Sequence, residues 1–257
     1  MKELIGVIHL KPLPGSCGSR EKFDDILNFA LHDAENLVEG GISQVIVENF
    51  GDAPFRCDSV EPHTVAFMTR AILRIKEEFP DLTVGVNVLR NDGKAAVGIA
   101  AATDARFVRI NVLTYAMVTD CGLINGMAHE IMRYKKLLNP EIKVYADVLV
   151  KHAYPLSEYN PVQIAKDTAE RGGADAIIVT GESTGQEVNI EILEKIKSGL
   201  KNTKVFVGSG VTAQNIKNYS RYADGFIVGT SIKKYGLVDN PVDPVKVKEL
   251  VEIIKGI

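Results

Sequence analysis

Cysteine is scarce in this 257-residue sequence, tryptophan is absent, and no long apolar run occurs. The three cysteines, Cys17, Cys57 and Cys121, are an odd number, lie far apart and form no CxxC pair, so neither a disulfide framework nor a structural zinc site is expected. No stretch of about 18 apolar residues could form a transmembrane helix. The first residues lead into a strand-like run without the charged and apolar regions of a signal peptide. We therefore expect a protein of the reducing cytoplasm.

The sequence also has no excess of basic over acidic residues. The net charge is −3, whereas nucleic-acid-binding domains usually carry a strongly basic surface, so nucleic acid is not an expected partner. Hydrophobic residues make up 46% of the chain and charged residues 25%, which is typical of a globular protein with ample material for a core. The lack of tryptophan, with abundant lysine, glutamate and isoleucine, favours a heat-adapted source.

Apolar runs of strand length alternate along the chain with amphipathic segments that have the wider spacing of helices. The expected strands are residues 4–10, 44–48, 83–89, 107–113, 143–150, 176–180, 204–207 and 225–228. The expected helices are residues 23–39, 65–79, 94–102, 126–138, 162–171, 190–199, 212–219 and 245–254. Strict alternation implies parallel strands with right-handed crossovers. Eight repeats in about 250 residues predict an α/β fold, a (β/α)8 TIM barrel with eight parallel strands.

No linker or low-complexity stretch interrupts the series, so residues 1–257 are interpreted as a single domain. In this barrel we expect Val108, Val148 and Ile178 to be buried between the sheet and the helices. Long loops follow four of the expected strands, at residues 11–22, 49–64, 114–125 and 151–161. They lie at the C-terminal ends of strands, where the active sites of such barrels are found.

The last two expected strands end in small residues that suit an anion. One run ends in Gly208-Ser209-Gly210, before a helix for which Thr212 is the expected N-cap, and the other ends in Gly229-Thr230. Neighbouring strand ends of this kind offer backbone N–H groups and the positive end of a helix dipole to a phosphate. The predicted phosphate-binding residues are Gly181, Gly208, Ser209, Gly210, Gly229 and Thr230. The alternative is that these glycines only permit tight turns.

Polar residues inside the expected strands can be sorted by parity, because alternate side chains of a barrel strand point to the helices and to the interior. Val108, Ile110 and Val112 suit the helix side, which turns Arg109 and Asn111 inward. The same alternation predicts further inward side chains. They are Glu48, Asn87, Tyr145, Asp147, Lys151 and Thr180, with His9 on a run of ambiguous parity.

Buried charges must be paired, so Glu48 and Asp147 are natural counter-charges for Arg109 or Lys151. We expect these four residues to form the catalytic set, with the two cations holding an anion or a developing oxyanion. A carboxylate beside two cations has a lowered pKa and is a weak base, so Glu48, which does not share a strand with Lys151, is the better candidate base. Asp147 is then the orienting partner. The predicted substrate-binding residues are His9, Asn87, Asn111, Asp120, His152 and Thr180.

Other interpretations of these residues stay open. Lys151 could form a Schiff base if it is desolvated beside Arg109. No HxH or HExxH spacing supports a divalent-metal site, so no metal or other cofactor is predicted. The cysteines could supply a nucleophile, although cysteine is generally a small buried hydrophobe. The polar network could also be a set of ion pairs that only stabilises the barrel top.

Seven segments of the sequence resemble the BtpA family. They are residues 6–15, 47–55, 85–92, 109–114, 119–120, 146–152 and 207–212. The resemblance runs almost end to end and implies a TIM barrel. The family takes its name from a photosystem I assembly factor, and the resemblance implies no catalytic residue set. Cys121 departs from the pattern at a place where a polar residue is usual.

Two functions follow as hypotheses. The leading one is an enzyme acting on a small phosphorylated metabolite, a sugar or polyol phosphate, by proton abstraction, isomerisation or aldol-type cleavage. The other is a non-catalytic assembly or regulatory factor of the BtpA type. A scaffold has no need of convergent polar residues at the barrel mouth, but it does need an exposed apolar patch. In either case we expect a homo-oligomer.

Overall fold

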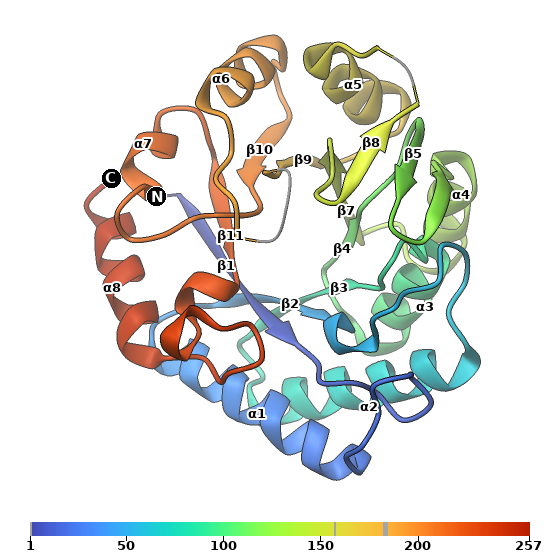
Figure 1. Cartoon of the computed structure of the whole chain (residues 1–257), viewed down its shortest axis with the longest axis vertical. Coiled ribbons are helices and arrows are strands. Elements are labelled where there is room, and N and C mark those ends of the chain that lie inside the picture. The colour runs from blue at the N-terminus through green and yellow to red at the C-terminus, as the bar shows by residue number, and fades with distance from the viewer. Residues whose placement is uncertain (1, 157, 182–184) are drawn as a thin grey trace.

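Eight parallel strands close into a barrel, as the alternation predicts (Figure 1). A computed structural model describes residues 2–156, 158–181 and 185–257. The barrel strands are β1 (Glu3–His9), β2 (Gln44–Glu48), β3 (Thr83–Asn87), β4 (Phe107–Ile110), β7 (Lys143–Val148), β9 (Ala176–Val179), β10 (Lys204–Val207) and β11 (Gly225–Val228). Each pairs with its neighbour in the chain-order series, and β11 pairs with β1, which completes the ring. The predicted TIM barrel is confirmed.

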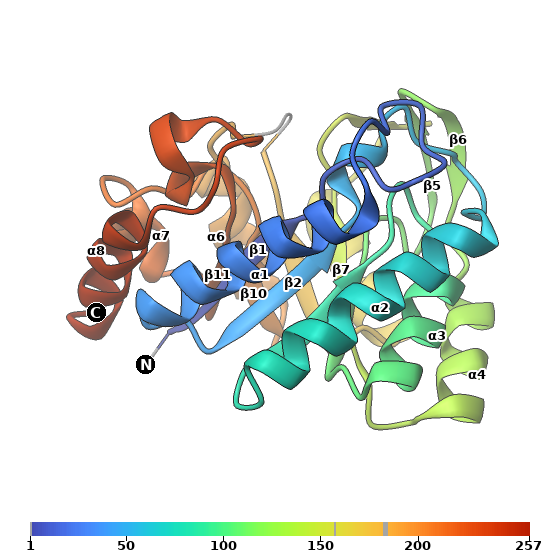
Figure 2. The ribbon, with the colours of Figure 1, turned by 90° about the horizontal axis from the view of Figure 1, so that it is seen from below.

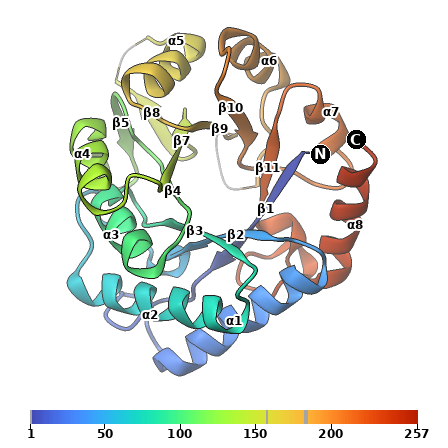
Figure 3. The same ribbon diagram turned by 180° about the vertical axis from the view of Figure 1, so that it is seen from behind.

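Helices form an outer ring around the strands, as views from the front and from behind show (Figures 1 and 3). They are α1 (Phe23–Glu39), α2 (Pro62–Glu78), α3 (Gly93–Thr103), α4 (Ala128–Leu138), α5 (Pro161–Lys166), α6 (Ile190–Gly199), α7 (Ile216–Ser220) and α8 (Pro244–Lys255). Several begin at a side-chain cap: Asp92, Asn160, Asn189 and Asp243 each accept a hydrogen bond from a first-turn N–H. Proline starts α2, α5 and α8, where its missing N–H costs nothing.

The core has two layers. Val108 and Val148 belong to the layer between strands and helices, as predicted. Ile178 does not: it lies inside the barrel, and Ile177 and Val179 face the helices instead, so this part of the prediction is wrong. The inner layer fills the lower barrel with apolar side chains, which leaves the polar side chains to its C-terminal end. Its members are Ile5, Val7, Ile46, Phe107, Tyr145, Ala176, Ile178, Phe206 and Ile227.

A small antiparallel sheet replaces part of two segments that were expected to be irregular. It consists of β6 (Gly122–Asn125), β5 (Ala116–Thr119) and β8 (Ala153–Pro155), in that order. Figure 2 shows β5 and β6 at the same end of the barrel as the long loop after β1. Leu123, Val118 and Tyr154 are cross-strand neighbours on this sheet and are 50%, 42% and 74% exposed, so they form an outward apolar row. The expectation of plain loops at residues 114–125 and 151–161 is therefore wrong in part.

The helix expected at residues 212–219 is shorter and begins later. By its assigned start at Ile216, α7 has Asn215 rather than Thr212 at its N-cap. Thr212 N donates to Asn215 Oδ1 at 2.8 Å, and Asn215 N donates to Thr212 Oγ1 at 3.4 Å. Ile216 N also donates to the Thr212 carbonyl oxygen at 3.1 Å, so Thr212 makes the contacts of a capping box around a single turn that precedes α7. The segment after β10 therefore forms a turn at the C-terminal end of the barrel before the helix begins.

The space beside two glycines predicts the effect of replacing each of them with alanine. A β-carbon added at Gly85 would lie 2.3 Å from the Phe107 ring, whereas one added at Gly98, inside α3, would come no closer than 3.7 Å to Tyr134. We expect Gly85→Ala to lower the free energy of unfolding by about 1–3 kcal/mol through overpacking. Gly98→Ala should raise it by up to about 1 kcal/mol through helix propensity. Urea denaturation of both variants measures this, and equal effects would contradict it.

Candidate active site

Two adjoining cavities open at the C-terminal ends of the barrel strands. One, of about 160 Å³, is lined by the loops after β10 and β11, and the other, of about 220 Å³, by the ends of β2, β3, β4 and β7. Glu48, Arg109 and Lys151 line both cavities. A ligand that occupies both would therefore pass these three side chains. The loops that carry the cavities are also those that the sequence singles out.

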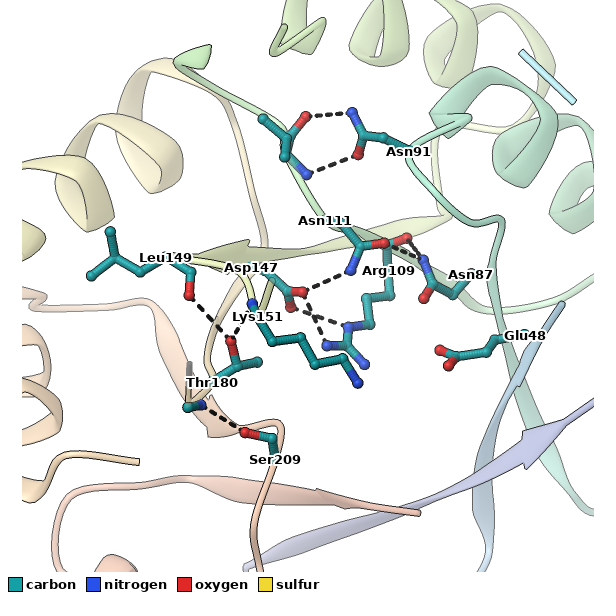
Figure 4. A network of polar contacts seen from close by, with 12 residues as sticks. Glu48, Asn87, Asn91, Arg109, Asn111, Asp147, Leu149, Lys151, Thr180 and Ser209 are labelled. Carbon is teal, nitrogen blue, oxygen red and sulfur yellow. Dashed lines mark hydrogen bonds and ion pairs between the residues drawn. The ribbon is translucent and has the colours of Figure 1, made fainter. Parts of the chain in front are cut away.

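A buried network of hydrogen bonds centred on Asp147 lies at the C-terminal end of the barrel, beside the cavities (Figure 4). Arg109 donates to both carboxylate oxygens of Asp147, from Nε at 3.1 Å and from Nη2 at 3.0 Å. Asn111 Nδ2 donates to Asp147 Oδ2 at 2.8 Å, and Asn87 Nδ2 donates to Asn111 Oδ1 at 3.0 Å. Burial alone would lower the pKa of Arg109, but Asp147 and Glu48 outweigh it and raise the pKa above its usual range. Asp147 lines neither cavity, which is consistent with an orienting role.

The amide of Asn87 is held at its nitrogen. Its Nδ2 also donates to the Arg109 carbonyl oxygen at 2.9 Å, so the amide orientation is determined. Asn87 Oδ1 is buried, and no donor among the residues that the structure describes reaches it. Since Asn87 lines the larger cavity, this oxygen is an acceptor that suits a hydroxyl or amine hydrogen of a ligand.

Lys151 is positioned through its backbone. Its N–H donates to Thr180 Oγ1 at 3.1 Å, and its carbonyl oxygen accepts from Arg90 Nη2 at 2.7 Å. Thr180 lines neither of the two cavities, so the structure gives it a positioning contact rather than a place against a ligand. Leu149 and His152 both have φ of 57°, a left-handed conformation that costs energy in residues other than glycine and is often found at functional sites.

Glu48 lies opposite Lys151 and beside His9. Glu48 is 3% exposed, and its Oε1 is 3.6 Å from His9 Nε2. Burial holds the pKa of His9 well below its usual range, and the charges of Lys233, Lys151 and Arg109 lower it further. His9 is therefore neutral at pH 7, and its contact with Glu48 is not an ion pair.

The predicted phosphate residues divide between two places. Gly208, Ser209, Gly210, Gly229 and Thr230 line the smaller cavity. Gly181 lies outside it, and its N–H donates to Ser209 Oγ at 2.7 Å. Gly210 has φ of 66°, and a β-carbon there would lie 2.2 Å from the Gln186 carbonyl oxygen, so only glycine fits this approach.

The loop after β11 contributes free donors to the smaller cavity. Thr230 and Ser231 begin a 3₁₀ turn (Thr230–Ile232), and neither backbone N–H donates to a residue that the structure describes. His9 and Ser231 line the same cavity, and within the described ranges the buried atoms His9 Nδ1 and Ser231 Oγ have no hydrogen-bond partner. A concave site with several unused polar groups suits a polar ligand.

Sequence reasoning missed four residues of the larger cavity. With the predicted Asp120 and His152, it is lined by Phe50, Phe55, Leu89 and Arg90. Arg90 is 4% exposed, and its Nε lies 3.5 Å from Asp120 Oδ1. Phe50, Phe55 and Arg90 follow the expected strands, so parity cannot find them. Leu89 shares the parity of Asn87 but is apolar, so a search for polar side chains does not select it. The resemblance segments at 47–55 and 85–92 do include them.

Known proteins similar to this chain agree with the fold and the resemblance. The sequence profile of the BtpA family matches residues 1–256. The chain belongs to the BtpA family. An uncharacterised protein of Methanocaldococcus jannaschii is 46% identical over 98% of this chain and 95% of the relative. The photosystem I biogenesis protein BtpA of Synechocystis is 43% identical over 97% of this chain and 86% of that protein.

Solved structures similar to this BtpA-family chain are barrels with low sequence identity. N-(5'-phosphoribosyl)anthranilate isomerase from Pyrococcus furiosus covers 99% of this chain and 100% of its own, with a TM-score of 0.60 and 15% identity. At that identity the likeness concerns the fold alone. Among the described residues, no group of three or more His, Cys, Asp or Glu side chains could hold a metal ion, and no helix is long and apolar enough to cross a membrane.

Proposed function

We propose that this BtpA-family protein is an enzyme that acts on a small phosphorylated metabolite, a sugar or polyol phosphate. The observation that carries the proposal is the pair of adjoining cavities that share Glu48, Arg109 and Lys151. One cavity offers unused donors for a phosphate, and the other offers an unused acceptor for a hydroxyl. The shared side chains are the reactive ones.

The smaller cavity would hold the phosphate. The N–H groups of Thr230 and Ser231, the Ser231 hydroxyl and the ammonium of Lys151 all border it. Backbone N–H groups and a nearby cation stabilise a phosphate dianion better than a neutral group. Gly210 and Gly229 would let the anion approach the backbone closely. The structural likeness to the N-(5'-phosphoribosyl)anthranilate isomerase barrel concerns the fold alone, and it supports the phosphate site only by analogy.

The larger cavity would hold the carbon skeleton. Phe50, Phe55 and Leu89 come from the β2 and β3 side, and the polar groups of β4 and β7 face them across the mouth. Asn87 Oδ1 would accept a substrate hydroxyl, and Glu48 would take a proton from the carbon next to a carbonyl group. Arg109 and Lys151 would stabilise the charge that develops on the carbonyl oxygen. Isomerisation and aldol-type cleavage both begin with such a step.

Ligand binding gives the direct test. A phosphorylated metabolite at 100 times its Kd is expected to stabilise the protein by about 2.7 kcal/mol, which a thermal-shift screen detects. Gly210→Ala should remove the shift, because the new β-carbon would collide with Gln186. Gly41→Ala is the matched control: Gly41 also has a positive φ, of 95°, but precedes β2 at the opposite end of the barrel. It should lower Tm and keep the ligand shift. No shift across a broad set of phosphorylated metabolites would contradict the proposal.

A second candidate is a non-catalytic assembly factor. The exposed apolar row of Leu123, Val118 and Tyr154 favours it, because a docking surface needs such a patch. The Synechocystis relative is named for photosystem I biogenesis. The polar mouth is what this candidate leaves unexplained, since docking through the row requires neither Glu48 nor Lys151. Failure of the ligand screen would favour this second candidate.

A further inference from the structure

Lys233 and the half-buried Lys151 differ in how their charges are compensated. Lys233 is fully buried, and its Nζ donates to Asp33. Lys151 borders both cavities, and within the part of the chain that the structure describes its Nζ has no hydrogen bond and no carboxylate oxygen within 4.0 Å. The nearest carboxylate along the chain, Asp147 on β7, accepts hydrogen bonds from Arg109 and Asn111. A lysine without an anion is unusual in such a place.

Burial favours the neutral amine of Lys151. It lowers the pKa of Lys151, and the charge of Glu48 is the strongest opposing influence. The guanidinium groups of Arg109 and Arg90 add to the lowering, and Asp147 adds to the opposition. A desolvated lysine beside other cations is the form in which this side chain acts as a nucleophile. A lysine that only bound a phosphate would bind it more strongly as a fully charged ammonium.

The position of Lys151 suits attack on a ligand. Its backbone is held at the N–H by Thr180 and at the carbonyl by Arg90, so the side chain starts from a rigid base. Figure 4 shows it extending alongside Arg109 toward Glu48. Since Lys151 lies where the two cavities meet, a ligand with its phosphate in one and its carbon skeleton in the other places its first carbons beside Nζ.

We propose that Lys151 forms a Schiff base with an aldehyde or ketone carbon of the phosphorylated substrate. The proposal deepens the proposed function and rests on it for the place of the phosphate. The Nζ lone pair attacks the carbonyl carbon, and the carbonyl π pair moves to the oxygen. That oxygen leaves as water with two protons of the original ammonium, so an ammonium and a carbonyl yield a protonated imine and one water. Glu48 carries protons between nitrogen and oxygen, and the imine then serves as the electron sink for carbon–hydrogen or carbon–carbon cleavage.

Trapping with borohydride tests this step. The full chain is incubated separately with dihydroxyacetone phosphate, with pyridoxal 5′-phosphate and with pyruvate, and each mixture is reduced with sodium borohydride. We expect at least one phosphorylated probe to add its mass less one oxygen atom, and peptide mapping to place the adduct on Lys151. Lys151→Arg should lose the adduct, because arginine keeps the positive charge but forms no imine. Lys94→Arg, at an exposed lysine of α3, should keep it.

The outcomes separate this proposal from the proposed function. Equal labelling of many lysines, or no adduct on Lys151 with any of the three probes, would overturn the Schiff base, whatever the ligand screen shows. This result does not depend on how the variants fold, because it is obtained with the unaltered chain. An adduct on Lys151 that forms equally with pyruvate and is not suppressed by inorganic phosphate would support the imine and contradict the phosphate site.

Discussion

Glu48→Gln is expected to lower kcat by about 10²–10⁴-fold while ligand binding stays nearly unchanged, because removal of a general base has an effect of this size. Glutamine has nearly the same volume and can occupy the same buried site, but it cannot take a proton from carbon. The substrate would come from the metabolite screen, with kcat measured in steady state and binding by thermal shift. Glu48 is the only carboxylate that lines both cavities among the described residues.

Asp147→Asn serves as the contrasting variant. The Asp147 carboxylate accepts three hydrogen bonds from Arg109 and Asn111, and an amide cannot accept all of them. We therefore expect both binding and turnover to fall, together with stability, because Arg109 is left as a buried charge without a counter-charge. If Glu48→Gln retains full activity, Glu48 is a structural counter-charge and the assignment of the base is wrong.

Asp33→Ala is expected to lower the free energy of unfolding by about 3–5 kcal/mol, the usual cost of leaving one partner of a buried ion pair alone. Asp33 on α1 accepts from Lys233 Nζ and, through Oδ1, from Val242 N at 2.7 Å. Both side chains of the pair are fully buried. Lys233 comes directly after the turn Thr230–Ile232, so the pair also anchors the loop that borders the smaller cavity. Urea denaturation measures the loss, and the ligand shift should shrink with it.

A control for this variant lies on the same helix. Asp24 pairs with Arg70 at 2.9 Å, but the two side chains are 74% and 56% exposed. Asp24→Ala should change stability by no more than about 1 kcal/mol, because water screens exposed pairs. In the double variant Asp33→Leu with Lys233→Met, neither charge remains, and much of the lost stability should return. A large loss in the double variant would show that packing rather than the unpaired charge explains the effect.

The alternation of side chains predicts their orientation best in strands where apolar and polar residues alternate. Val108, Arg109 and Ile110 alternate between apolar and polar, so the sequence alone places Arg109 inward. The run Ala176–Val179 is apolar and buried throughout, as in parallel strands covered on both faces, so by itself it does not separate Ile177 from Ile178. Thr180, predicted inward at the end of the expected strand, shares the parity of Ile178, and the prediction for Ile178 did not follow it.

The exact start of a helix also lies outside sequence reasoning. Thr212 was expected to cap a helix and does exchange capping-box hydrogen bonds with Asn215, but the regular helix α7 begins only at Ile216. The pairing of β5 with β8 joins segments more than 30 residues apart, and such pairing depends on which surfaces the barrel brings together. Neither outcome can be read from local periodicity.

By itself the sequence determined the barrel, the end of the barrel at which the candidate site lies and most of the inward polar residues. These features depend on local periodicity and on the order of elements, which the chain carries directly. Only the tertiary structure decided which charges pair. Arg109 and Lys151 are both cations near Asp147, yet the planar guanidinium takes both carboxylate oxygens and leaves the Lys151 amine without an anion. The proposed chemistry depends on that difference, because a lysine without a counter-charge loses its proton more readily and the neutral amine is the nucleophilic form.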